Sequence, residues 1–144
     1  MTSPQRRLSD RIIRTQADLE EVWRLLMEPL GFDEGSLWLM ALDADGRPTR
    51  QMLEIQDDGP PPRPDDVVSF GEMLRLIGED AAPGVRWAML RSRPGSGAIT
   101  AADRGLIGAL LASCRAAGVP TEVAHLASDE DLVPVPYDEL AASA

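Results

Sequence analysis

The chain is poor in the residues that bind transition metals or form disulfides. Of its 144 residues, one is cysteine, Cys114, and one is histidine, His125. A single cysteine excludes an intramolecular disulfide and a cysteine-rich zinc site. Because Cys114 falls within a helical pattern of apolar residues, we expect a buried, unreactive thiol.

Long apolar runs and positive charges are also scarce. No stretch approaches the roughly 18 apolar residues that a membrane-spanning helix needs, and residues 1–16 hold no apolar segment typical of a secretory signal. We therefore expect no membrane partner and a cytoplasmic location. The 24 acidic and 14 basic side chains give a net charge of −10. This charge repels phosphate backbones, so we expect no nucleic-acid partner.

The remaining composition, with 44% hydrophobic and 26% charged residues, is that of an ordinary globular domain. We expect a loose lead-in over residues 1–14, a single α/β domain over 15–136 and a tail over 137–144. Apolar spacing predicts the elements of this domain. The expected helices cover 15–30, 66–80 and 100–117, and the expected strands cover 37–42, 50–55, 85–90, 121–126 and 132–135. Strands alternating with amphipathic helices predict a three-layer sandwich, in which helices cover both faces of a mixed sheet of about five strands.

The segment "RSRPGSGAITAAD", from Arg91 to Asp103, connects the third expected strand to the third helix. Together with the strand "VRWAML" before it, this segment resembles the JAB/MPN metalloprotease-like family, particularly the RadC type. The resemblance covers most of residues 34–126 and implies a JAB/MPN or cytidine-deaminase-like fold. The chain also resembles short actinobacterial proteins that share "RPG", a following "T-x-A-D-R" and "AAGVP".

The residues at the family's metal-ligand positions are changed in this chain. By the resemblance, the two family histidines fall on Arg91 and Arg93, the helix-opening serine on Thr100 and the aspartate on Asp103. The family's catalytic glutamate lies one position out of register from Glu34. A zinc ligand must offer a lone pair, whereas guanidinium only donates hydrogen bonds and stays protonated. We therefore expect no metal, no cofactor and no catalytic residue.

Two interpretations of the loop remain. In the first, the loop is structural: Thr100 and Asp103 form a capping box, Pro94 and Gly95 make a tight turn, and Asp103 forms a partly exposed ion pair with Arg91 or Arg93. In the second, the glycine-rich turn and the arginines bind a small anion or an acidic peptide. The candidate anion-binding residues are Arg91, Arg93, Ser96 and Thr100.

The sequence supports three functions to different degrees. We favour a non-catalytic JAB/MPN-like adaptor that binds a protein partner or a second copy of itself. An anion-binding protein is the alternative. The third is an enzyme that is either metal-independent or has rearranged ligands such as Glu34, Asp103 and His125. His125, however, is expected to be a half-buried strand residue with satisfied hydrogen bonds. The acidic clusters, including Asp129 to Asp131, are expected to be solvated turns.

Overall fold

The computed structural model describes residues 11–57 and 63–141, and its elements follow the predicted order. A short helix, α5, is added at the end. The elements are α2 (Gln16–Met27), β1 (Gly35–Leu42), β2 (Pro48–Asp57), α3 (Pro64–Ala81), β3 (Arg86–Ser92), α4 (Ala101–Ala116), β4 (Ala124–Ala127), β5 (Leu132–Val135) and α5 (Tyr137–Ala141).

The strands form one five-stranded sheet in the order β2-β1-β3-β4-β5. β1 is antiparallel to β2 and β3, β3 is parallel to β4, and β4 is antiparallel to β5. The parallel pair is joined by α4, as a crossover connection requires. The predicted mixed sheet of about five strands is confirmed.

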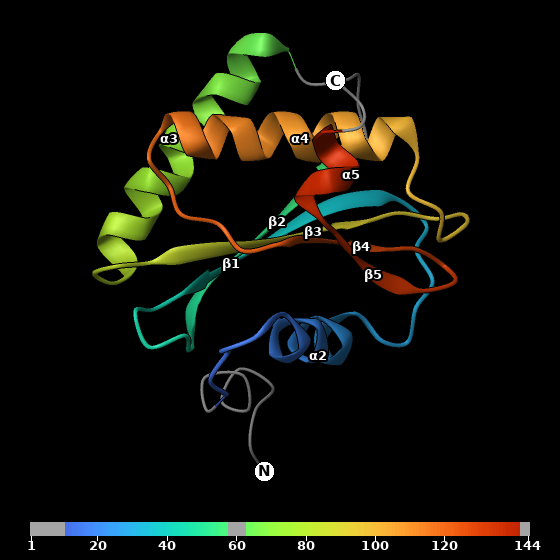
Figure 1. Cartoon of the computed structure of the whole chain (residues 1–144), viewed down its shortest axis with the longest axis horizontal. Coiled ribbons are helices and arrows are strands. Elements are labelled where there is room, and N and C mark those ends of the chain that lie inside the picture. The colour runs from blue at the N-terminus through green and yellow to red at the C-terminus, as the bar shows by residue number, and fades with distance from the viewer. Residues whose placement is uncertain (1–10, 58–62, 142–144) are drawn as a thin grey trace.

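Helices cover both faces of this sheet. Figure 1 shows α2 on one face and α3, α4 and α5 on the other. The core is divided in the same way: Trp23 and Leu90 belong to the cluster under α2, and Trp87 and Ile107 belong to the cluster under α3 and α4. Because both faces are covered, β1 can be apolar at almost every position. The three-layer arrangement is therefore confirmed.

The local signals for helix starts work as predicted in α2 and α4. Thr15 caps α2: its hydroxyl accepts from the Asp18 amide at 3.1 Å, and Asp18 accepts in return from the Thr15 amide at 3.1 Å. The start of α3 differs from the prediction. Its cap residue is Arg63 rather than an aspartate, with Pro64 in the first turn, and the Arg63 amide donates to Asp66 at 3.2 Å.

The ends of the chain differ from the expected lead-in and tail. Ile13 is buried against α2, and its amide donates to the Gly46 carbonyl at 2.8 Å. Residues 1–10 of the lead-in and residues 58–62 of the proline-rich connection lie outside the described part of the chain. In the expected tail, residues 137–141 form α5, because Leu140 packs against the core next to Gly108. No helix in the described ranges is long and apolar enough to cross a bilayer.

Candidate functional site

The loop of residues 93–100 joins the end of β3 to the first turn of α4. The predicted capping box is present here: the Thr100 hydroxyl accepts from the Asp103 amide at 3.1 Å, and Asp103 Oδ2 accepts from the Thr100 amide at 2.9 Å. This exchange satisfies two of the helix-terminal amides and fixes the orientation of the Asp103 carboxylate.

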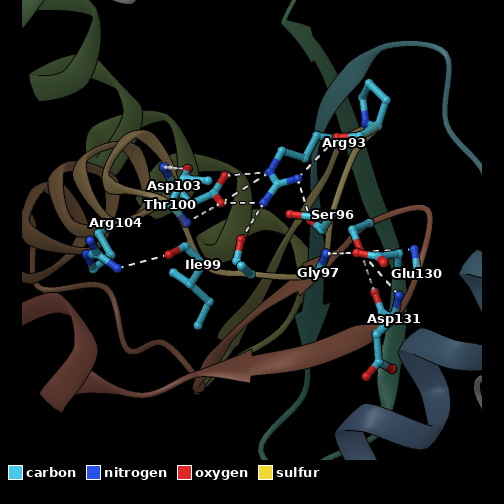
Figure 2. A network of polar contacts seen from close by, with 12 residues as sticks. Arg93, Ser96, Gly97, Ile99, Thr100, Asp103, Arg104, Glu130 and Asp131 are labelled. Atoms are coloured by element: carbon cyan, nitrogen blue, oxygen red, sulfur yellow. Dashed lines mark hydrogen bonds and ion pairs between the residues drawn. The ribbon is translucent and has the colours of Figure 1, made fainter.

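The guanidinium of Arg93 is held from every side by acceptors of its own chain (Figure 2). Its Nε donates to both Asp103 oxygens at 2.9 and 3.1 Å, and Nη2 donates to Asp103 Oδ2 at 2.7 Å. The remaining N–H groups donate to backbone carbonyls of the loop: Nη1 to Pro94 and Ser96 at 3.1 and 2.9 Å, and Nη2 to Ala98 at 2.8 Å. Every donor of this side chain therefore has an intramolecular partner.

The Arg93–Asp103 ion pair is more buried than predicted. The side chains are 14% and 4% exposed, whereas the sequence suggested a partly exposed contact. Burial alone would raise the pKa of Asp103, but hydrogen bonds from Arg93 and Thr100 outweigh it and hold the pKa below its ordinary value. The hydrogen bond to Asp103 raises the pKa of Arg93. Both groups therefore stay charged at neutral pH, and each neutralises the other.

The amides of the glycine turn are occupied by carboxylates from the β4–β5 connection. The Gly95 amide donates to Asp129 Oδ2 at 2.9 Å, and the Gly97 amide donates to Glu130 Oε1 at 2.6 Å. Asp129 also accepts from the Phe32 amide at 2.9 Å, and the hydrogen bonds from Gly95 and Phe32 lower its pKa. The acidic side chains are exposed at a turn, as predicted, but Asp129 and Glu130 also accept hydrogen bonds from backbone amides of two other loops.

The four candidate anion-binding residues do not converge on one open site. Arg91 lies over β1, where a Cβ added to Gly35 would be 2.7 Å from Arg91 Nη2, while Arg93 reaches toward α4. Ser96 contributes its carbonyl to Arg93, and the Thr100 hydroxyl serves as a helix cap. The amides of this turn donate instead to carboxylates of the chain's own β4–β5 connection.

The residues considered as rearranged metal ligands are also separated. No group of three or more histidine, cysteine, aspartate or glutamate residues in the described part of the chain could hold a metal ion. His125 alternates in β4 with Ala124 and Leu126, which face α4, so it faces α2 instead. Asp103, in α4, therefore lies across the sheet from His125.

His125 is fully buried rather than half-buried. Its Nδ1 lies 3.1 Å from the Val123 carbonyl, while Nε2 has no hydrogen-bond partner among the described residues. Burial lowers the pKa of His125, so the ring is neutral at physiological pH and Nδ1 carries the proton. The prediction that its hydrogen bonds are satisfied is wrong for Nε2.

A surface that the sequence analysis missed lies on the outer side of α4. Positions that a surface helix normally fills with charged residues are alanine or glycine here, and each is exposed or half-exposed. We call them the α4 face: Ala101, Gly105, Gly108, Ala109, Ala112 and Ala116. The signal was present in the sequence, because the helical pattern that predicts the buried stripe also identifies the opposite side.

Two hollows flank the α4 face and share Ala109 and Ala112. The hollow toward α3 has a volume of about 480 Å³ and is lined by Val67 and Val68. The hollow toward α5 has a volume of about 450 Å³ and is lined by Tyr137 and Leu140. Val68 and Tyr137 are 68% and 47% exposed, so large apolar side chains border both hollows.

Comparison of the chain with models of known protein families gives no match, and comparison with curated proteins gives none.

Proposed function

We propose that the chain is a non-catalytic JAB/MPN-like domain that works as a small adaptor and binds a protein partner through the α4 face. The observation that carries this proposal is the alanine and glycine outer side of α4, with a hollow on each flank that is bordered by a large exposed apolar side chain. Exposed apolar surface of this kind marks interaction sites in soluble proteins. Small residues let a partner's backbone approach closely.

The closed loop supports the non-catalytic part of the proposal. Residues at the positions of the family's zinc ligands would need to offer lone pairs, but Arg93 offers only donors. The Asp103 carboxylate already accepts hydrogen bonds from Arg93 and from the Thr100 amide. The contacts stabilise the junction of β3 and α4 and leave Arg93 no N–H group for a substrate. A structural role explains each of these contacts.

The JAB/MPN relationship is part of the same proposal. It is supported by the order of strand, glycine-rich loop and capped helix over residues 86–116, and by a sheet with helices on both faces. In this interpretation Arg93 stands where the family has a zinc-binding histidine. Its guanidinium then takes the place of the zinc ion as the positive charge next to Asp103.

Site-specific photo-crosslinking in the native host tests the adaptor function. A photoreactive phenylalanine analogue at Ala112, in the centre of the α4 face, should give one defined adduct, whose crosslinked segment is mapped by mass spectrometry. The matched control carries the analogue at Leu25, which is 44% exposed on α2. An Ala109→Glu change should weaken binding of the purified partner at least tenfold. Equal adducts at both positions, or none at Ala112, would contradict the proposal.

A further inference from the structure

We infer that two copies of the chain pair through β2, edge to edge and antiparallel, so that their sheets join into one continuous sheet. The inference goes beyond the proposed function, because it concerns an edge of the sheet instead of the α4 face. It follows from the backbone groups that β2 directs outward and from the sign and spacing of its charged side chains.

The two edges of the sheet, β2 and β5, are protected to different degrees. β5 has four residues, and Pro134 among them has no amide hydrogen, so this edge is short and poor in donors. β2 has ten residues, and its one proline, Pro48, is at the first position. An edge strand of this length presents a row of backbone donors and acceptors with which another strand can pair.

The hydrogen bonds of β3 show in which direction its peptide groups point. The Trp87 amide donates to the Pro120 carbonyl at 3.0 Å, and the Trp87 carbonyl accepts from the Glu122 amide at 2.9 Å, so Trp87 points toward β4. Because successive residues of a strand point in opposite directions, Leu90 points toward β1. There it lies opposite Trp38.

The same alternation continues across β1 to β2. Trp38 directs its peptide groups toward β3, so Leu39 directs its own toward β2, where it lies opposite Leu53. Leu53 therefore points inward, while its neighbours Met52 and Glu54 point outward. No hydrogen bond within the described ranges reaches the backbone of Met52 or Glu54 on this outer side.

The charges of β2 select a second copy as the strand that pairs with this edge. Arg50 and Glu54 lie two residues before and two residues after Met52. With a two-fold axis at Met52, Arg50 lies opposite Glu54 of the partner subunit, and this contact occurs twice. Opposite charges at facing positions stabilise an antiparallel strand pair, whereas an axis at Glu54 would place two carboxylates face to face.

Both charged side chains are available for this contact. Arg50 is exposed, and within the described ranges it takes part in no ion pair. Glu54 is exposed, and its Oε2 accepts from Ser36 Oγ at 3.0 Å, which leaves the other carboxylate oxygen for a guanidinium. Each chain carries a net charge of −10, but charges more than about 8 Å apart are largely screened at physiological ionic strength.

Sedimentation velocity and amide hydrogen exchange of the full chain test the pairing. Sedimentation should show a monomer at low micromolar concentration and a dimer at submillimolar concentration. In the dimer the amides of Met52 and Glu54 should exchange slowly with solvent, as measured by NMR, and in the monomer they should exchange rapidly. The Leu53 amide points toward β1 in both states and is the internal control.

Charge reversal tests the register. Arg50→Glu and Glu54→Arg should each weaken the dimer about tenfold, because each change turns two attractions into repulsions. Mixing the two variants brings opposite charges together at both contacts and should restore the affinity. Arg115→Glu makes the same change of charge at an exposed position of α4 and should leave the dimer unchanged.

Three results would overturn the inference: a monomer at every concentration, a dimer in which the Met52 and Glu54 amides still exchange rapidly, or mixed variants that pair no better than each variant alone. A photoreactive analogue at the exposed Gln56, in the native host, identifies the occupant of the edge. An adduct with a second copy supports the inference, and an adduct with another protein alone rejects it. None of these results depends on the crosslink at Ala112 that tests the adaptor function.

Discussion

Arg93 and Asp103 form a buried ion pair in which Nη2 lies 2.7 Å from Oδ2 and Nε contacts both carboxylate oxygens. The pair connects the end of β3 to the first turn of α4. The other N–H groups of the guanidinium donate hydrogen bonds to backbone carbonyls of the loop between these elements. In the proposed JAB/MPN-like interpretation, these two residues stand at the family's metal-ligand positions. Their geometry makes the loop a rigid junction.

Neutralising Asp103 should destabilise the fold. Asp103→Asn keeps an oxygen that can cap α4 but leaves the buried Arg93 charge without its partner, so the free energy of unfolding should fall by about 3 kcal/mol. Urea denaturation followed by circular dichroism measures this change. The control is Glu122→Gln, which breaks the partly exposed Arg86–Glu122 pair of 2.9 Å and should cost less than about 1 kcal/mol. Similar losses of unfolding free energy in the two variants would show that the Arg93–Asp103 pair contributes no more than a surface ion pair.

Two glycine-to-alanine changes in helices should have opposite effects. A Cβ on Gly71 in α3 would lie 2.3 Å from the Ser113 carbonyl oxygen of α4, so Gly71→Ala must separate the helices and should cost about 2 kcal/mol or more. A Cβ on Gly105 meets nothing within 4 Å, and Gly105→Ala should stabilise by about 0.5–1 kcal/mol. Melting temperatures measured by calorimetry give both signs. A stabilising Gly71→Ala would contradict the close contact of α3 and α4.

Stability should decrease in mildly acidic solution because of His125. Its pKa is lowered from 6.5 by burial, so below pH 6.5 the unfolded chain binds more protons than the folded chain. The free energy of unfolding should therefore be constant above about pH 7 and fall from about pH 6.5 down to the folded-state pKa, by up to about 1.4 kcal/mol per pH unit.

Urea titrations between pH 7.5 and 5.5 measure this slope, and His125→Gln should remove it. Carboxylates such as Asp103 and Asp129 have lowered pKa values and titrate below this window, so they do not obscure the comparison. The charges that act on His125 from α2, Glu20 and Arg24, have opposite signs. An equal slope in the variant would mean that His125 does not stay neutral in the folded protein.

The thiol of Cys114 should not react while the chain is folded. Cys114 is fully buried, and burial raises its pKa to about 11, so both access and thiolate formation are suppressed. A colourimetric thiol reagent should label the native protein at the slow rate of global unfolding and label the protein in urea within seconds. Fast labelling under native conditions would disprove the predicted burial.

The sequence was sufficient to predict contacts between residues that are close in the chain or that recur at helical spacing. The buried stripe of α4 and the capping box of Thr100 and Asp103 follow from spacing within one helix. The carboxylates of Asp129 and Glu130 were assigned to solvent because their amide partners lie more than thirty positions away. Such pairings depend on how the sheet aligns β3 with β4.

Two other features depended on tertiary packing in the same way. The five-residue helix α5 is too short for a periodic signal and forms where Leu140 packs near Gly108. The side chains of Arg91 and Arg93 point to different places, and this depends on the neighbouring strand, because Arg91 lies over Gly35 of β1. The candidate site was thus predicted in its residue types and only partly in its geometry.

Nitrogen-15 NMR of the arginine side chains gives the most direct test that the loop is a closed junction. The Arg93 Nε–H group should exchange slowly with solvent, and its resonance should not move when zinc or inorganic phosphate is added at millimolar concentration. The exposed Arg115 should exchange rapidly in the same spectra. A saturable shift of the Arg93 resonance with either ion would show that the loop opens to a ligand and would contradict the account.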